Sequence, residues 1–128
     1  MDSNGIAASN VTQWVAAYEG AWRAPGTEAL TEMFTPDAAY SQGPYEQPVG
    51  GLPAIAEMWE RERSSPDEEF TMSSEVVAVD VDTAVVRVEV HYGLPTKQEF
   101  RDLWIIRFAA DGRCRAFEEW PFAPDAAP

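Results

Sequence analysis

The sequence predicts a single α+β domain in which helices come first and an antiparallel sheet follows. In the first half of the chain, large apolar residues recur every three or four positions, as one buried face of a helix requires. From Glu69 onward, apolar and polar residues alternate, which is typical of strands with one face in the core. The length of 128 residues fits one compact domain. We expect this domain to span residues 10–122, between a flexible N-terminus (1–9) and a flexible tail (123–128).

The first expected helix carries a stripe of large side chains with the spacing i, i+3, i+4, i+7 and i+11. Pro25 and Gly26 end this helix, because both residue types interrupt helical hydrogen bonding. Most of the stripe is aromatic, so we expect this face to pack against the core. The stripe consists of Val11, Trp14, Val15, Tyr18 and Trp22.

Two shorter helices are expected after the first. The second ends at Pro36, and a short strand from Ala38 to Ser41 follows it. The third begins after Gly51 and closes at Ser64-Ser65-Pro66. The inward residues are Leu30, Met33 and Phe34 on the second helix, and Ile55, Met58 and Trp59 on the third.

Turn signals divide the second half of the chain into four strands of an antiparallel meander. One register places the even-numbered residues from Phe70 to Trp120 on the core face and pairs opposite charges on the other face. In this register Val79 faces Thr83, Tyr92 faces Gln98 and Ala109 faces Arg113. The resulting charge pairs are Glu75 with Arg87, Glu89 with Arg101 and His91 with Glu99.

Two acids, Asp102 and Glu118, fall on the apolar face in this register. Burial without a neighbouring cation raises the pKa of a carboxyl group, which suits a general acid or base. Alternatively, Asp102 accepts hydrogen bonds from Trp or Tyr donors, and Glu118 lies at a wet sheet edge. The position of His91 opposite Glu99 favours a solvated cross-strand pair over a catalytic base.

Aromatic side chains are numerous, with 5 Trp and 4 Tyr in the chain. Such side chains combine an apolar body with a polar tip, so they suit the wall of a ligand cavity. Plain core packing is the alternative interpretation. The candidates for ligand binding are Trp22, Tyr40, Tyr45, Trp59, Trp104 and Trp120.

Composition excludes several classes of function. The net charge of −13 disfavours nucleic acids and anionic membrane surfaces as partners. One cysteine and one histidine allow neither an internal disulfide nor a thiolate or multi-histidine metal site. The sequence has no apolar run long enough to span a bilayer, and its start lacks the features of a secretory signal, so we expect a cytoplasmic protein.

The layout resembles the nuclear transport factor 2-like superfamily, which includes ketosteroid isomerases and SnoaL-like polyketide cyclases. The resemblance covers about residues 10–122. It implies a cone-shaped, cystatin-like α+β fold with three N-terminal helices packed on a curved antiparallel sheet. It rests on the stripe from Tyr18 to Trp22, the segment from Leu30 to Tyr40, the Gly50-Gly51 helix start and the turn from Ile106 to Arg113.

The resemblance also implies roles for individual residues. The tyrosine that ketosteroid isomerases use as an oxyanion donor falls on Tyr18, but their base falls on Gln42 and their second donor on Trp104. SnoaL-like cyclases use a cavity acid without metal or cofactor. By that analogy Asp102 is the acid/base and Tyr18 the oxyanion donor.

These features lead to two hypotheses of different classes. The first is a cofactor-independent isomerase, cyclase or lyase that acts on an apolar or aromatic carbonyl-containing molecule, with Asp102, Tyr18 and Glu118 as candidate catalytic residues. The second is a protein of the same fold that binds a small ligand or a partner without catalysis. A half-apolar odd-numbered face, with Leu103 among its residues, favours a homodimer through the sheet.

Overall fold

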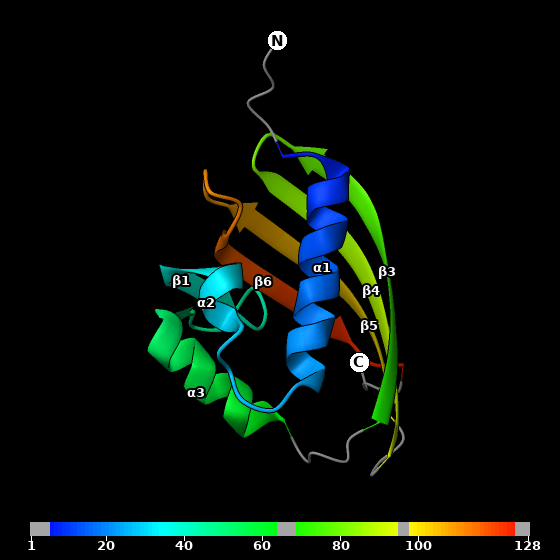
Figure 1. The fold of residues 1–128 in the computed structure, drawn as a ribbon. Coiled ribbons are helices and arrows are strands. Elements are labelled where there is room, and N and C mark those ends of the chain that lie inside the picture. The colour runs from blue at the N-terminus through cyan, green and yellow to red at the C-terminus, as the bar shows by residue number, and fades with distance from the viewer. Residues whose placement is uncertain (1–5, 64–68, 95–97, 125–128) are drawn as a thin grey trace.

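The computed structural model describes residues 6–63, 69–94 and 98–124 (Figure 1). The described chain is an α+β fold, as predicted, with one six-stranded sheet in the order β2-β1-β6-β5-β4-β3. The helices are α1 (Ala8–Arg23), α2 (Leu30–Met33) and α3 (Leu52–Glu62). The strands are β1 (Phe34–Ser41), β2 (Val49–Gly50), β3 (Glu69–Asp80), β4 (Thr83–Leu94), β5 (Gln98–Phe108) and β6 (Cys114–Phe122).

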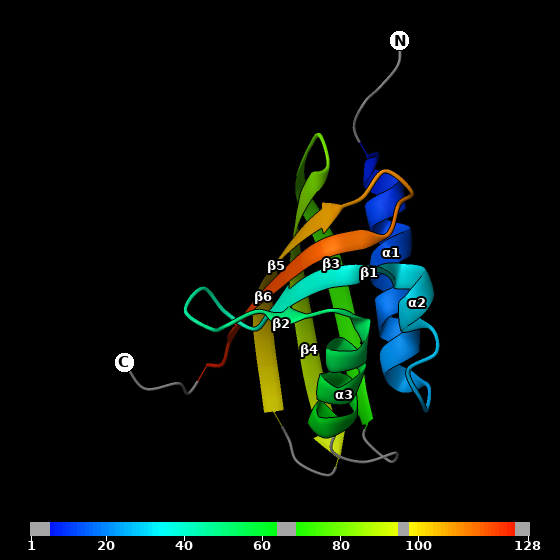
Figure 2. The ribbon, with the colours of Figure 1, turned by 90° about the vertical axis from the view of Figure 1, so that its left-hand side faces the viewer.

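The sheet is curved and does not close on itself, and the three helices lie on one side of it (Figures 1 and 2). Strands β3 to β6 form the predicted antiparallel meander. The predicted short strand is longer than expected, because it begins at Phe34, which leaves the second helix with a single turn. This strand, β1, runs parallel to β6 and pairs with the two-residue β2 on its other side.

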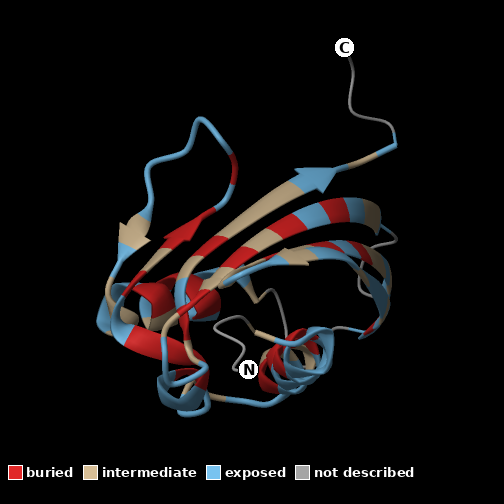
Figure 3. Cartoon of the chain, turned by 90° about the horizontal axis from the view of Figure 1, so that it is seen from above, coloured by how far each residue is buried: buried red, intermediate tan, exposed pale blue. Residues whose placement is uncertain are grey.

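The core lies between α1 and the concave face of the sheet. The predicted aromatic stripe is confirmed, since four of its five members are buried and Trp22 is half-buried. The indole nitrogen of Trp14 donates a hydrogen bond to the carbonyl of Met33 at 3.0 Å, which ties α1 to α2. Viewed from above, buried and exposed residues alternate along the central strands, as expected where one face meets the helices (Figure 3).

Gly51 joins β2 to α3. It precedes the first residue of the helix with a φ of 88°, a conformation that glycine adopts without a Cβ clash. Its N–H donates to the carbonyl of Ala38 at 2.8 Å, which fixes the start of α3 beside β1. The predicted inward residues Ile55, Met58 and Trp59 are buried. The predicted end of this helix at Ser64-Ser65-Pro66 lies outside the described residues.

The predicted register is confirmed between β4 and β5, where Tyr92 pairs with Gln98 and His91 with Glu99. Between β3 and β4, Glu75 pairs with Arg87 as predicted, but the pairing of Val79 with Thr83 is wrong. The structure has a two-residue turn and an extra residue between Val76 and Ala78. The bulge cancels the shift that the tight turn introduces, so the register beyond it is the predicted one.

The predicted register of β6 is wrong beyond its first residue. The turn itself forms as expected, since the N–H of Ala109 donates to the carbonyl of Arg113 at 2.7 Å. A one-residue bulge then follows, because Phe108 pairs with Cys114 but Arg107 pairs with Ala116. From there on, the odd-numbered residues of β6 face the core, since a shift of one residue exchanges the two faces of a strand.

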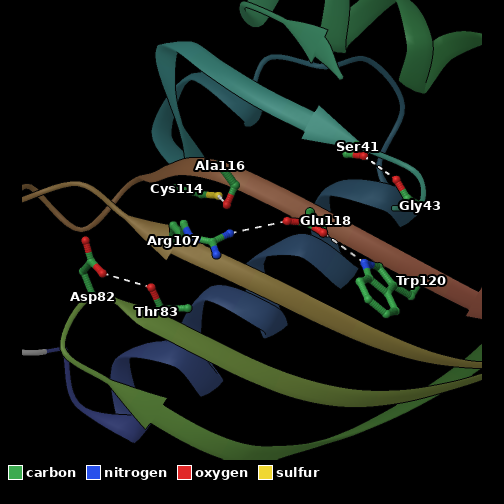
Figure 4. Close-up of polar contacts among 9 residues, drawn as sticks. All are labelled: Ser41, Gly43, Asp82, Thr83, Arg107, Cys114, Ala116, Glu118 and Trp120. Atoms are coloured by element: carbon green, nitrogen blue, oxygen red, sulfur yellow. Dashed lines mark hydrogen bonds and ion pairs between the residues drawn. The ribbon is translucent and has the colours of Figure 1, made fainter. Parts of the chain in front are cut away.

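The bulge moves Glu118 and Trp120 to the face of the sheet that points away from α1 (Figure 4). There, a guanidinium nitrogen of Arg107 lies 3.4 Å from one carboxylate oxygen of Glu118. The indole N–H of Trp120 donates to the other oxygen at 3.0 Å. The register that placed both residues on the core face is therefore corrected.

Candidate functional site

A cavity of about 460 Å³ lies between the helices and the concave face of the sheet. Its volume is within the range typical of small-molecule sites. Most of its wall is aromatic or aliphatic, with a few polar groups between. The residues that line it are Tyr18, Trp22, Tyr40, Gln42, Met58, Trp59, Glu62, Phe70, Met72, Val90, Tyr92, Gln98, Phe100, Asp102, Trp104, Glu119 and Pro121.

Asp102 lies on β5 with its side chain in the cavity wall and only 6% of its surface exposed. The indole N–H of Trp104 donates to its Oδ2 at 3.3 Å. Its Oδ1 has no hydrogen-bond partner among the described residues. Burial raises the pKa of Asp102 to about 6, although the hydrogen bond from Trp104 acts in the opposite direction. Asp102 therefore releases and takes up a proton near neutral pH.

Glu119 is a second carboxyl group in the same wall, on the neighbouring strand, where it pairs with Trp104. The Tyr40 hydroxyl donates to its Oε1 at 3.0 Å. Burial raises the pKa of Glu119 to about 7, the charges of Asp102 and Glu62 add to this shift, and the hydrogen bond from Tyr40 opposes it. The two cavity acids thus change their charge over neighbouring ranges of pH.

Two tyrosines continue from Glu119 across the cavity. The hydroxyl oxygens of Tyr18 on α1 and Tyr40 on β1 lie 2.7 Å apart, within one hydrogen bond. Burial, reinforced by the charge of Glu119, raises the pKa of both phenols well above their usual range. Both hydroxyls therefore keep their protons and act as neutral hydrogen-bonding groups.

Aromatic contacts hold the cavity wall in place. The ring of Tyr18 lies 4.5 Å from that of Trp104 and 5.0 Å from that of Trp59, centroid to centroid. At the cavity's edge, the guanidinium of Arg63 lies 5.8 Å from the rings of both Trp22 and Trp59. Arg63 also donates to the carbonyls of Ala24 and Gly26, so it connects α3 to the end of α1. These contacts fix the large side chains that give the cavity its shape.

A model of the SnoaL-like domain matches residues 11–117, which is most of the chain. The chain belongs to the SnoaL-like domain family. This confirms the predicted superfamily and agrees with the packing of the three helices on a curved sheet.

Solved structures with the same fold include proteins named as cyclases and epoxide hydrolases. A protein named as a SnoaL-like polyketide cyclase, from Jannaschia sp. CCS1, is 19% identical with a TM-score of 0.70 over 94% of each chain. The epoxide hydrolase/cyclase-like enzyme SalBIII, of pyran ring formation in the polyether salinomycin, is 15% identical with a TM-score of 0.72 over 89% of this chain and 92% of its own. An epoxide hydrolase from M. tuberculosis is 13% identical, with a TM-score of 0.69 over 89% of this chain and 84% of its own. At these identities the likeness shows the fold alone, and no curated protein matches the sequence.

The structure of this SnoaL-like domain brings together most of the residues that the sequence singled out. Asp102 and Tyr18 line the cavity, as do four of the six aromatic candidates. Tyr45 does not, since it lies in the loop after β1 with 98% of its surface exposed. Glu118 and Trp120 lie on the other face of the sheet, because the bulge in β6 exchanges the two faces of this strand. The four aromatic candidates in the wall are Trp22, Tyr40, Trp59 and Trp104.

Glu119 was missed by the sequence reasoning, because strict alternation placed its neighbour Glu118 inward. A signal for the shift exists in the sequence. Cys114 and Phe117 are both core-type residues but stand three apart, which alternation along one face does not allow. Both are fully buried in the structure, on either side of the bulge.

The remaining titratable candidates lie away from the cavity. His91 is on the outer face, half-exposed, with its ring nitrogens 3.7 Å from Glu89 and 4.0 Å from Glu99. This position agrees with the solvated pair and not with a base in the cavity. Cys114 is fully buried, its thiol donates to the carbonyl of Ala116 at 3.2 Å (Figure 4), and burial raises its pKa to about 12.

Within the described ranges, no cluster of three or more His, Cys, Asp or Glu side chains is arranged to hold a metal ion. In the same part of the chain, no helix is both long and apolar enough to cross a lipid bilayer.

Proposed function

We propose that this SnoaL-like domain catalyses proton transfer on a small, neutral, largely apolar molecule that carries a carbonyl group, as a cofactor-independent isomerase, cyclase or lyase. The observation that supports it most is the pair of carboxyl groups in the cavity wall, Asp102 and Glu119, whose pKa values are raised by desolvation to about 6 and about 7. Acids with such pKa values accept and return protons efficiently near neutral pH. An apolar wall with a few polar groups suits an apolar substrate.

In this mechanism Asp102 is the base. Its carboxylate removes a proton from the carbon next to the carbonyl. The C–H electron pair forms a C=C bond to the carbonyl carbon, and the π pair of the C=O bond moves onto oxygen to give an enolate. Asp102 then returns the proton to carbon. Tyr18 donates a hydrogen bond to the oxygen as negative charge develops there. The acidic side chains of the wall, which include Glu62, disfavour an anionic substrate.

Exchange of carbon-bound hydrogen for deuterium tests the proposal without knowledge of the natural substrate. We expect the protein to accelerate exchange at the carbon between the ring and the carbonyl of 2-tetralone, a neutral aromatic ketone, in heavy water, followed by proton NMR. The rate should rise with pH through about 6, where Asp102 becomes ionised. Asp102→Asn should lower the rate by at least about 100-fold, the usual contribution of a positioned base.

Glu118→Gln is the matched control, because Glu118 lies on the outer face and outside the cavity wall. Its exchange rate should equal that of the parent. Full exchange by Asp102→Asn contradicts the proposed base. Binding of the ketone with exchange only at the buffer rate supports the alternative, a non-catalytic binding protein with the same cavity.

We also propose that two copies of the chain associate through the outer face of the sheet. Leu103 and Trp120 pair with one another on this face, and Phe122 on the same strand is 58% exposed. Trp120 is part of this surface because of the register shift in β6, which turns its side chain away from the cavity. An apolar patch of this kind on a charged protein is typical of an interface.

A further inference from the structure

Glu119, Tyr40 and Tyr18 form a continuous hydrogen-bonded chain that begins at β6 and ends at α1, with all three side chains in the cavity wall. We propose that Glu119 is a positioning residue that determines, through Tyr40, whether the Tyr18 hydroxyl presents a hydrogen-bond donor or an acceptor to the cavity. The inference rests on the proposed function, in which Tyr18 must donate to the substrate oxygen.

Each phenol carries a single hydroxyl hydrogen, so the protonation state of Glu119 sets the direction of both hydrogen bonds in this chain. An ionised Glu119 only accepts, so Tyr40 gives its hydrogen to Glu119, and Tyr18 gives its own to Tyr40. Tyr18 then offers the cavity lone pairs alone. A protonated Glu119 donates to Tyr40, so Tyr40 donates to Tyr18, and the hydrogen of Tyr18 is available to a ligand. The distances of 2.7 Å and 3.0 Å suit either direction.

The surroundings of Glu119 allow both forms. The groups that act on it are Tyr40 from β1, Asp102 from β5 and Glu62 from α3, and Tyr18 from α1 connects through Tyr40. Tyr92 from β4 acts on Tyr18 in turn. All of these groups are neutral or acidic, and in the described parts of the chain no Lys or Arg lines the cavity. With burial, they raise the pKa of Glu119 to about 7.

The two cavity acids then have opposite requirements. The proposed base, Asp102, works when ionised, whereas Tyr18 donates when Glu119 is protonated. These requirements are compatible, because the charge of an ionised Asp102 raises the pKa of Glu119 and so favours its protonated form. A ligand that only accepts hydrogen bonds should therefore bind with uptake of a proton whenever Glu119 starts out ionised.

Two matched probes separate this effect from general binding. 2-Acetylnaphthalene carries an oxygen that only accepts, and 2-ethylnaphthalene has a similar shape with no polar atom. Neither probe titrates between pH 5.5 and pH 8.5. We expect the affinity of the ketone to fall about tenfold as pH rises through about 7, because the hydrogen bond from Tyr18 to the ketone oxygen is lost. Quenching of tryptophan fluorescence measures this affinity. The affinity of the hydrocarbon should stay constant.

Three variants locate the effect in the chain of hydroxyls. Glu119→Gln supplies an amide donor at every pH, so ketone affinity should be high and constant. Tyr40→Phe frees the Tyr18 hydroxyl from Glu119, so ketone affinity should again be constant. In Asp102→Asn the affinity for the ketone should still fall as pH rises, but with its midpoint at a lower pH, because the charge that raises the pKa of Glu119 is gone. Glu118→Gln should behave as the parent does.

Constant ketone affinity in the parent protein overturns the inference, and so does a pH dependence that survives in Tyr40→Phe. If neither probe binds, the proposed function fails at the binding step and this inference fails with it. If the ketone shows the expected pH dependence but 2-tetralone does not exchange, the role of Glu119 stands and the proposed chemistry is wrong.

Discussion

Asp102 occupies a site that a neutral side chain of the same shape fills at lower free energy. Burial raises its pKa from 3.8 to about 6, so the folded protein binds a proton that the unfolded chain releases. The protonated carboxyl therefore favours the folded state fully below pH about 4. This contribution is lost as pH rises through about 6 and amounts to about 3 kcal/mol.

Asp102→Asn should therefore stabilise the protein at pH 8. The amide keeps an oxygen for the indole N–H of Trp104 but removes the cost of a buried charge. We expect a gain of about 1 to 3 kcal/mol at pH 8, several degrees in Tm, and about a third of that gain at pH 4.5, where the unfolded chain already releases most of this proton. Thermal unfolding of the parent protein and the variant at the two pH values measures the difference in Tm. A lower Tm for the variant at both values shows that the carboxylate is held by structural hydrogen bonds.

Single elements show what the sequence predicts and what it does not. The stripe on α1 and the register of β4 with β5 were predictable, because local periodicity and cross-strand charge pairs determine them. The pairing of β1 with β6 was not, since it joins segments about 80 residues apart in the sequence that carry no shared pattern. The bulge in β6 was missed because it changes only how the residues of the strand pair with β5 and leaves the types of residue in the strand the same. It nevertheless exchanges the two faces of the strand. That exchange put Glu118 in the predicted site in place of Glu119.

The junction between β2 and α3 provides a prediction at the scale of an element. Gly51→Ala places a Cβ on a residue with φ of 88° and ψ of 150°, a backbone region that essentially only glycine occupies, which costs about 1 to 3 kcal/mol. We expect its Tm to fall by several degrees. Gly50→Ala is the control, because a Cβ there meets no atom within 4 Å and no positive φ is involved. Equal Tm values for the two variants contradict the proposed strain at Gly51.

The whole molecule combines a strong negative charge with an apolar patch on the outer face of the sheet, formed by Leu103, Trp120 and Phe122. Two copies that meet through this face bury Leu103 and Trp120 but bring together two chains of net charge −13. Salt screens such repulsion over about 8 Å at physiological ionic strength, so the proposed dimer should strengthen as salt is added. A dimer held mainly by ion pairs would show the opposite trend.

Leu103→Lys should convert the proposed dimer to a monomer, since it places a charge inside the apolar patch that Leu103 forms with Trp120. Sedimentation velocity at micromolar concentration, in low and physiological salt, measures the change. Gln13→Lys is the control, because Gln13 is exposed on α1, which lies on the other side of the sheet from the patch. A parent protein that sediments as a monomer under all of these conditions contradicts the assembly.

Cys114 provides a built-in reporter of how often β6 opens. It is the only cysteine of the chain, it is fully buried beside the bulge, and it pairs with both Phe34 and Phe108. Because burial also raises the pKa of its thiol to about 12, a water-soluble thiol reagent reacts only when this end of β6 separates from its neighbours. The rate of labelling in native buffer therefore counts openings of the same strand that carries Glu119 into the cavity.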